Sequence, residues 1–209
     1  MKENFGKNYF YGYKDSNYIN YDKLNPSKLF KGVKFFIRKQ NIRGRILDIG
    51  CAFGFLLKEV SQNFDELYGF DISEFAVEKA KKIIPNANLK IVDLEKSLPY
   101  PDNFFDCITA LDVLEHTENF EKNFEKIVKK LKKGGYLIIS TPINEWPRKI
   151  FGFLDKDKTH ISVLREDELN KIIKKNRLSV ADKRYYSPFP IIYKVPYIPF
   201  SIEVLLRKQ

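Results

Sequence analysis

The chain has 209 residues, of which 44% are hydrophobic and 31% are charged. This composition excludes an intrinsically disordered chain, and the length suits one α/β domain with extensions. The sequence contains no uninterrupted apolar run of about 18 residues, so we expect no membrane-spanning helix. Residues 1–10 carry no signal-peptide pattern.

The net charge of +10 is unevenly distributed: residues 1–45 carry +8, residues 46–147 carry −5 and residues 148–209 carry +7. The basic flanks suit either solvated surface or contact with an anionic partner. Both cysteines, Cys51 and Cys107, lie in apolar strand-like contexts. We therefore expect buried free thiols and a reducing, cytoplasmic compartment. The two histidines and two cysteines show no metal-ligand spacing, and no metal is predicted.

The chain begins with an aromatic segment and then becomes helical. Residues 1–23 have no clear periodicity but include the aromatic residues Tyr9, Phe10, Tyr11, Tyr13, Tyr18 and Tyr21. Residues 27–39 have apolar residues at helical spacing, after a plausible helix start at Asn25-Pro26-Ser27.

Short apolar strands and single helices alternate in the middle of the chain. The predicted strands are residues 46–49, 67–70, 89–92, 104–110 and 136–140. The predicted helices between them are residues 55–63, 74–83 and 120–133, and Gly134-Gly135 is expected to end the last one. Strands separated by single helices form parallel βαβ units, and fully apolar strands suit a sheet covered on both faces.

After Pro142 the alternation is weaker. Residues 166–175 are predicted to form a helix, and residues 178–186 and 202–207 two final strands. Between those strands, four prolines within residues 188–199 argue against a regular helix or a central strand. Core packing is the favoured role of this stretch, and an apolar substrate pocket, a membrane surface or a subunit contact are the alternatives.

Residues 46–54 read Ile-Leu-Asp-Ile-Gly-Cys-Ala-Phe-Gly, a strand that runs into a turn of small residues before an apolar helix. Gly50 and Gly54 present no side chain to a ligand that approaches the backbone. The following helix points its free N–H groups back at the turn. The segment therefore favours a nucleotide-type site at the carboxyl end of a strand.

Three carboxylates, Asp48, Asp71 and Asp93, stand at or beside the ends of successive predicted strands. Because parallel strands end at the same edge of a sheet, the three should lie side by side there. Asp71 is the better candidate for a ribose diol, and Asp93 for an exocyclic amine such as that of adenine. Asp48 would lie under the loop. Helix capping is the alternative role for such residues.

These motifs, in this order, resemble the class I S-adenosylmethionine-dependent methyltransferases, in the branch of quinone-biosynthesis and related small-molecule enzymes. The matching segments are residues 46–54, 68–73, 93–94, 98–106, 111–116 and 131–140. The resemblance covers residues 44–142 closely and residues 159–207 loosely. It implies a Rossmann-like, doubly wound, seven-stranded and mostly parallel sheet with an antiparallel terminal strand and helices on both faces.

The resemblance also implies that S-adenosylmethionine binds and leaves as S-adenosylhomocysteine. Gly50, Cys51, Ala52 and Gly54 would surround the methionine part of this cofactor, and Leu111 would line the same side. The family pattern has glycine where this chain has Ala52, whose methyl group is small.

The adenosine part of the cofactor would lie further along the strand ends. Asp71 would hold the ribose, and Ile72 would pack on the adenine. Asp93 and Leu94 would reach the edge of the adenine ring. Asp48 completes the predicted cofactor-binding set.

Methyl transfer from a sulfonium is an in-line displacement, in which the protein mainly holds the nucleophile, the methyl group and the sulfur in line. His116 is a candidate general base for acceptors that must lose a proton, because an imidazole titrates near working pH. The alternative is that Glu115 and His116 order the loop and the start of the next helix. His160 is the weaker base candidate, and Asp112 would orient the substrate or the loop.

The sequence thus predicts a methyltransferase that acts on an oxygen, nitrogen or carbon atom of a small molecule, lipid or glycan. An anionic or amphiphilic molecule would suit this role of acceptor. Residues 1–44 would form an extension that either covers the cofactor as a lid or packs on the surface. Residues 45–209 would form the methyltransferase domain, with residues 143–200 on the substrate side.

Two other functions stay open at this point. The basic flanks favour a nucleic-acid (RNA) methyltransferase, although the sequence shows neither the Asn/Asp-Pro-Pro-aromatic tetrad of amine-methylating enzymes nor a separate RNA-binding module. The second alternative is a non-catalytic subunit that binds S-adenosylmethionine. Peripheral membrane contact is compatible with the apolar stretches near Lys194, Arg207 and Lys208.

Overall fold

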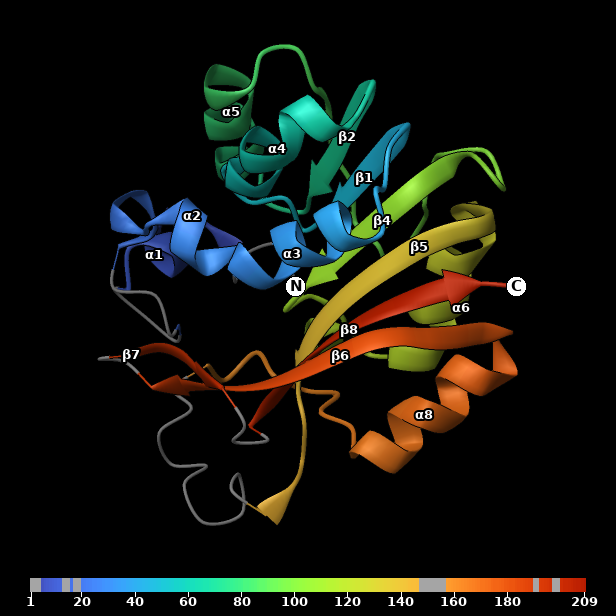
Figure 1. Cartoon of the computed structure of the whole chain (residues 1–209). Helices are drawn as coiled ribbons and strands as arrows, with labels where there is room; N and C mark the ends of the chain where they lie inside the picture. Colours follow the sequence, from blue (N-terminus) through green and yellow to red (C-terminus); the bar gives the residue numbers. More distant parts are fainter. Residues whose placement is uncertain (1–4, 13–15, 17–19, 147–156, 190–191, 197–199) are drawn as a thin grey trace.

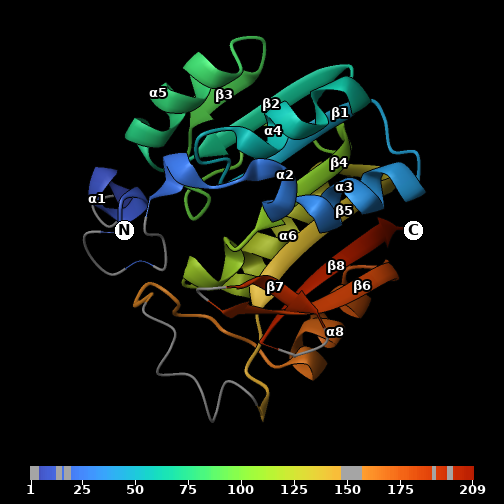
Figure 2. The same ribbon diagram turned by 60° about the vertical axis from the view of Figure 1, so that its left-hand side comes forward.

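An eight-stranded mixed sheet runs through the middle of the described part of the chain, and helices cover both of its faces (Figures 1 and 2). The computed structural model describes residues 5–12, 16, 20–146, 157–189, 192–196 and 200–209. Some predicted features lie outside the described residues: Tyr13 and Tyr18 of the aromatic segment, residues 147–156 of the substrate side, and residues 190–191 and 197–199 of the proline-rich stretch.

Within the described residues, the strands follow the order β3-β2-β1-β4-β5-β8-β6-β7. The first five of these are parallel, and β8 pairs antiparallel with both β5 and β6. The predicted seven-stranded, mostly parallel sheet with an antiparallel terminal strand is therefore confirmed, and the short β7 extends its edge. The strands are β1 (Arg45–Ile49), β2 (Glu66–Asp71), β3 (Asn88–Ile91), β4 (Phe105–Leu111), β5 (Leu131–Pro142), β6 (Leu178–Phe189), β7 (Ile192–Pro196) and β8 (Ser201–Lys208).

The helices divide between the two faces of the sheet, with α3, α4 and α5 on one face and α6 and α8 on the other (Figures 1 and 2). The helical elements are α1 (Lys7–Phe10), η2 (Tyr21–Lys23), α2 (Pro26–Leu29), α3 (Lys31–Lys39), α4 (Phe55–Val60), η3 (Ser61–Asn63), α5 (Glu74–Ile83), η4 (Leu114–His116), α6 (Phe120–Lys130) and α8 (Glu166–Lys175). Among the described residues, none of these helices is long and apolar enough to cross a bilayer.

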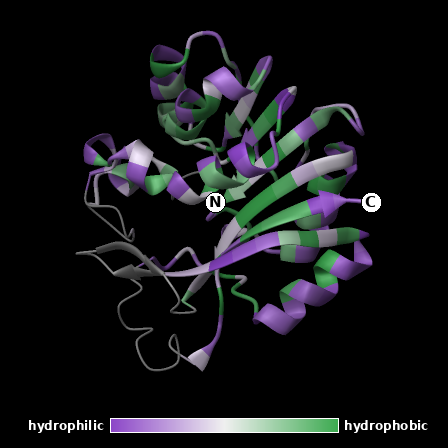
Figure 3. Ribbon diagram, viewed as in Figure 1, coloured by the Kyte–Doolittle hydropathy of each residue, from purple (hydrophilic) through white to green (hydrophobic). Residues whose placement is uncertain are grey.

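The alternation of side chains along the strands builds the two core layers. Successive strand residues point to opposite faces, so Ile46 packs with α3 and α4, whereas Leu47 packs with the side of α6. Figure 3 shows hydrophobic residues along the middle strands and many hydrophilic residues on the outer helices. The two cysteines are buried free thiols, as predicted from their apolar contexts.

The end of α6 differs from the sequence prediction. The helix ends at Lys130 and β5 begins at Leu131, so Gly134-Gly135 does not end the helix. Leu131 is fully buried and pairs with Phe105 of β4, which draws the chain into the sheet before the glycines are reached. Gly134 has a φ of +78°, and it lies where the pairing of β4 with β5 is irregular.

Candidate functional site

A cavity of about 130 Å³ lies where the carboxyl ends of β1, β2 and β4 meet the N-terminal segment. Most of the predicted site residues line it: Gly50, Ala52, Asp71, Ile72, Asp93, Leu94, Leu111 and His116. Asp48, Cys51, Gly54 and His160 are not among its lining residues. Four aromatic residues of the N-terminal segment also line the cavity: Phe5, Tyr9, Phe10 and Tyr21.

The turn after β1 holds three residues in the left-handed region, with φ values of +68° at Gly50, +46° at Ala52 and +76° at Gly54. A Cβ atom at Gly50 would lie 2.4 Å from Cγ2 of Val113, so glycine lets the loop after β4 pack against the turn. Gly54 precedes α4, and a Cβ atom there would lie 3.1 Å from Cγ2 of Ile84. Both glycines therefore have a structural role that the sequence does not reveal.

Ala52 occupies a position whose backbone favours glycine. A left-handed conformation costs an L-residue about 1–2 kcal/mol, and the structure shows where this alanine is held. Its side chain is only 8% exposed and packs in a cluster with Phe53 and the N-terminal aromatics. Its N–H donates to Oδ2 of Asp71 at 2.9 Å. The one departure from the family pattern is thus accommodated without breaking the turn.

Asp71 is the last residue of β2 and is held by the backbone on both sides. Oδ2 accepts from the N–H of Ala52, and Oδ1 accepts from the N–H of Ser73 at 2.8 Å. Burial raises the pKa of this carboxyl above its usual value, and the backbone N–H bonds oppose that rise. A carboxylate has about four lone-pair positions, so two bonds leave capacity for a ligand diol.

Asp93 and Asp48 take different positions around the same edge. Asp93 lines the cavity, and its Oδ1 accepts from the N–H of Glu95 at 3.0 Å, so it also caps the following turn. Asp48 is buried within β1, where Oγ1 of Thr109 donates to it at 2.6 Å. Burial, with the nearby Asp71, raises the pKa of Asp48 to about 7. No pattern in the sequence predicts the hydrogen bond between Thr109 and Asp48.

The N-terminal aromatics lie over the cavity rather than away from it. Tyr9, Phe10 and Tyr21 are buried, and the rings of Phe10 and Tyr21 each lie 4.9 Å from the ring of Phe53, next to the turn. Nζ of Lys79 on α5 donates to Asp22 at 2.9 Å. These contacts fasten the segment to the α5 side of the cavity.

On the opposite side, a chain of hydrogen bonds joins the N-terminal segment to His116. The hydroxyl of Tyr9 donates to Oδ2 of Asp157 at 2.9 Å, across 148 residues of sequence. The hydroxyl of Thr159 donates to Oδ1 of Asp157. Because that proton points to Asp157, Nδ1 of His116 acts as the donor to Thr159, 2.8 Å from its Oγ1 and 3.1 Å from its carbonyl oxygen.

This arrangement leaves the lone pair of His116 on Nε2. Burial and the neighbouring His160 lower the pKa of His116, so the imidazole is neutral near pH 7. The edge of the Phe5 ring lies against it, with 5.5 Å between the ring centres. A neutral imidazole at the cavity wall can accept a proton from a bound molecule.

Glu115 precedes His116 and is fully buried. Burial and the nearby Asp112 raise the pKa of its carboxyl well above the usual range. Its backbone carbonyl accepts from the N–H groups of Ile161 and Ser162, each at 2.9 Å. The segment that carries His160 is therefore fixed beside η4, although the sequence gives no indication of this contact.

Comparisons with known proteins bear on the family and the fold of this chain. The family model described as a methyltransferase domain matches residues 21–182. Phosphoethanolamine N-methyltransferase 1 of Arabidopsis thaliana is 26% identical over 192 residues, which cover 77% of this chain and 39% of the relative. The chain thus spans well under half of that relative. A ubiquinone biosynthesis O-methyltransferase of Bradyrhizobium diazoefficiens is 27% identical over 169 residues, which cover 73% of this chain and 67% of the relative.

The fold is also shared with solved structures. Magnesium protoporphyrin IX methyltransferase of Synechocystis, solved with S-adenosylhomocysteine, superimposes with a TM-score of 0.69. The two chains are 19% identical, and the match covers 88% of this chain and 83% of the other. Because the family model spans more than half of the sequence, the chain belongs to the methyltransferase-domain family, as its resemblance to the S-adenosylmethionine-dependent methyltransferases predicts.

Proposed function

We propose that this chain transfers a methyl group from S-adenosylmethionine to a small-molecule acceptor at the cavity between the glycine turn and His116. The observation that carries the proposal is the lining of this one cavity. The residues that line it include Asp71, Gly50, Ala52, Leu111 and His116. S-adenosylmethionine, when bound, supplies an electrophilic methyl group.

The chemistry of the lining fits this cofactor. Asp71 is oriented by two backbone N–H groups and retains acceptor positions for the ribose hydroxyls. Ile72 and Leu94 offer apolar surface to an adenine ring, and Asp93 stands beside them as an acceptor for its amine. Gly50 and Ala52 bring backbone rather than bulky side chains to the methionine side.

The protein contributes to the reaction mainly by positioning. Holding the nucleophile in line with the methyl group can supply about 7–11 kcal/mol of the barrier. Phe5, Tyr9, Phe10 and Tyr21 exclude water from one side of the cavity and so act as a lid. Nε2 of His116 takes the proton that an acceptor hydroxyl or amine releases, while Nδ1–H stays bonded to Thr159.

A small acceptor is supported by the relatives, whose names refer to phosphoethanolamine and to ubiquinone biosynthesis. The buried free thiols of Cys51 and Cys107 support a reducing compartment such as the cytoplasm. The acceptor's place is the region beyond Leu111 and His116, next to the segment that carries Thr159.

The test is transfer of a labelled methyl group from S-adenosylmethionine to a panel of acceptors that includes phosphoethanolamine and hydroxylated quinone precursors. We expect label in at least one acceptor class, with His116→Ala lowering turnover and leaving cofactor affinity within a factor of about three. Glu78→Gln, an exposed change on α5, is the control variant. Cofactor binding without turnover on lipid, quinone, amine or glycan acceptors would instead favour a non-catalytic binding subunit.

A further inference from the structure

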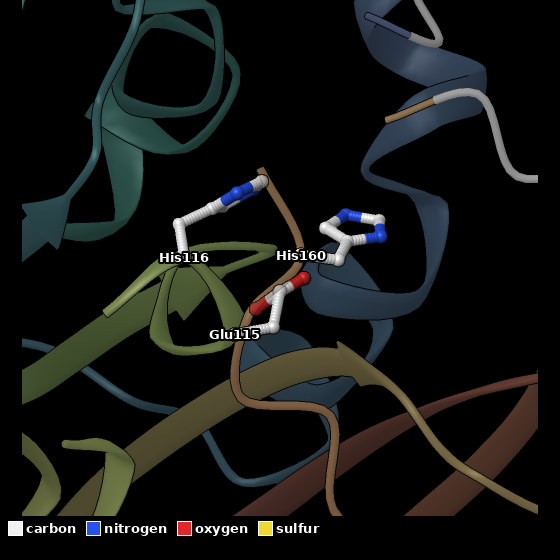
Figure 4. A group of neighbouring side chains, drawn as sticks. All are labelled: Glu115, His116 and His160. Atoms are coloured by element: carbon white, nitrogen blue, oxygen red, sulfur yellow. The ribbon is translucent and has the colours of Figure 1, made fainter. Parts of the chain in front are cut away.

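The only two histidines of the chain meet at one place in the fold. His116 ends η4, and His160 lies in the segment after residue 156, yet their ring centres are 4.9 Å apart. Glu115 belongs to η4 as well, and one ligand atom from each of the three side chains falls within 4.8 Å of the others. Figure 4 shows the three side chains turned toward one another.

Glu115 supplies the second observation. It is fully buried, and its Oε1 atom has no hydrogen-bond partner among the described residues. The other oxygen, Oε2, accepts a long bond of 3.4 Å from the hydroxyl of Thr141. A buried carboxyl oxygen without a partner is costly, so a group that satisfies it is expected. The Glu115 side chain belongs to the same cluster as the two imidazoles, and imidazoles are metal ligands in their neutral form.

We propose that Glu115, His116 and His160 bind one divalent metal ion of the class that accepts imidazole nitrogen and carboxylate oxygen together, such as Zn²⁺ or Mn²⁺. Two nitrogens and one oxygen are the ligand set of open zinc sites and of related transition-metal sites, whereas Mg²⁺ prefers oxygen alone. This ion would leave further coordination positions open to a bound molecule.

The geometry needs only local adjustment to close on an ion. Ligand atoms about 2.0–2.2 Å from a metal lie roughly 3.3 Å from one another. The ligand atoms of the three side chains lie within 4.8 Å of one another, so side-chain rotation would have to bring them closer by at most about 1.5 Å. His116 is already oriented by Thr159, which holds Nδ1 and directs the lone pair of Nε2 outward, as carbonyl partners do for histidine ligands. Asp112 and Asp157 add negative charge beside Glu115, which favours a cation.

The place of the site gives the ion a role, and this role rests on the proposed function. His116 lines the cavity, so an ion on it lies where the acceptor enters. On transfer to a hydroxyl, the oxygen–carbon bond forms, the carbon–sulfur bond breaks with its electron pair returning to sulfur, and the hydroxyl proton leaves. An ion held by these residues would make an acceptor hydroxyl lose its proton more easily, and that proton would pass to solvent before transfer. With the ion bound, Nε2 of His116 would be a ligand, so the base role proposed above for this nitrogen would apply to the metal-free chain alone, and the favoured acceptor atom would be oxygen.

The test measures metal binding in the absence of S-adenosylmethionine. The chelator-treated full chain is titrated by calorimetry with ZnCl₂ and MnCl₂, with MgCl₂ for comparison. Nitrogen NMR of the two imidazoles reports the ligands directly, because the chain has no other histidine. We expect one equivalent of Zn²⁺ or Mn²⁺ to bind, both imidazoles to shift, and Glu115→Gln and His160→Ala to weaken binding at least tenfold. Glu78→Gln should bind as the native chain does.

No binding at millimolar metal, or binding that Glu115→Gln and His160→Ala both leave unchanged, overturns the proposal. Near-ultraviolet circular dichroism and cofactor affinity, measured without metal, check that both variants are folded. If metal binding fails while S-adenosylmethionine still binds, only the metal site is refuted. If the metal binds and the cofactor does not, the proposed methyl transfer is refuted and the metal site stands.

Discussion

Replacing Asp71 should weaken cofactor binding more than any other single change at the adenosine end of the cavity. The proposed ribose contact consists of two hydroxyls that donate to a carboxylate already oriented by Ala52 and Ser73. Hydrogen bonds to a charged group contribute about 1.5–3 kcal/mol each. Two bonds at the lower end of that range amount to about 3 kcal/mol, and each 1.4 kcal/mol is a factor of ten in affinity. We therefore expect Asp71→Ala to raise the Kd by about 100-fold, and by no less than tenfold.

Calorimetric titration with S-adenosylhomocysteine measures this change without turnover. Asp102→Ala, which removes an exposed carboxylate paired with Lys130, controls for the loss of one negative charge. Because Asp71 also holds the turn, urea unfolding must show that the variant is folded under the titration conditions. An unchanged Kd in folded Asp71→Ala would refute the ribose assignment.

The pH dependence sharpens the same prediction. Burial raises the pKa of Asp71, so its carboxylate gains a proton at higher pH than an exposed aspartate does. A protonated carboxyl loses its charge and one acceptor position, and cofactor affinity should fall as pH falls through that raised pKa. In Asp71→Ala this acid-side fall should be absent.

Three further changes test other parts of the structure. Burial raises the pKa of Asp48 to about 7, so the free energy of unfolding of the native chain should fall by up to about 4 kcal/mol as pH rises from about 4 to 7. Asp48→Asn should lack this fall, so urea unfolding should show it gaining stability relative to the native chain over that pH range. Parallel pH profiles of the two proteins would contradict this. Tyr9→Phe removes the donor to buried Asp157 and should raise the cofactor Kd several-fold in calorimetry, whereas Tyr136→Phe, far from the cavity, should not. Gly50→Ala should destabilise the fold by about 2 kcal/mol or more, because its Cβ would clash with Val113. Adding Val113→Ala should recover part of this loss in a double-mutant cycle. Strictly additive effects of the two changes would show that this clash is absent.

Local patterns in the sequence predict the sheet and one end of the site. The strands follow from short apolar runs separated by single helices, and Asp71 and Asp93 reach the cavity because parallel strands end at one edge. The same reasoning fails at the end of α6. Gly134-Gly135 has the residue type of a helix stop, but the burial of Leu131 in the sheet ends the helix earlier.

Contacts between distant segments could not be predicted in this way. The bond of Tyr9 with Asp157, the bond of Thr109 with Asp48 and the packing of Val113 on Gly50 depend on side chains that no local period relates. The histidines show the same limit, because their spacing along the chain matches no metal motif, and only the fold brings His160 to Glu115 and His116. Ala52 is intermediate: its departure from the family pattern is visible in the sequence, but its left-handed backbone is visible only in the structure.

A crystal structure of the chain grown with S-adenosylhomocysteine tests the central claim most directly. We predict density for the ligand in the cavity, with its ribose hydroxyls within hydrogen-bond distance of Asp71 and its sulfur facing the side of Leu111 and His116. Ligand density elsewhere on the molecule, or a cavity without ligand when calorimetry shows saturation, would contradict it.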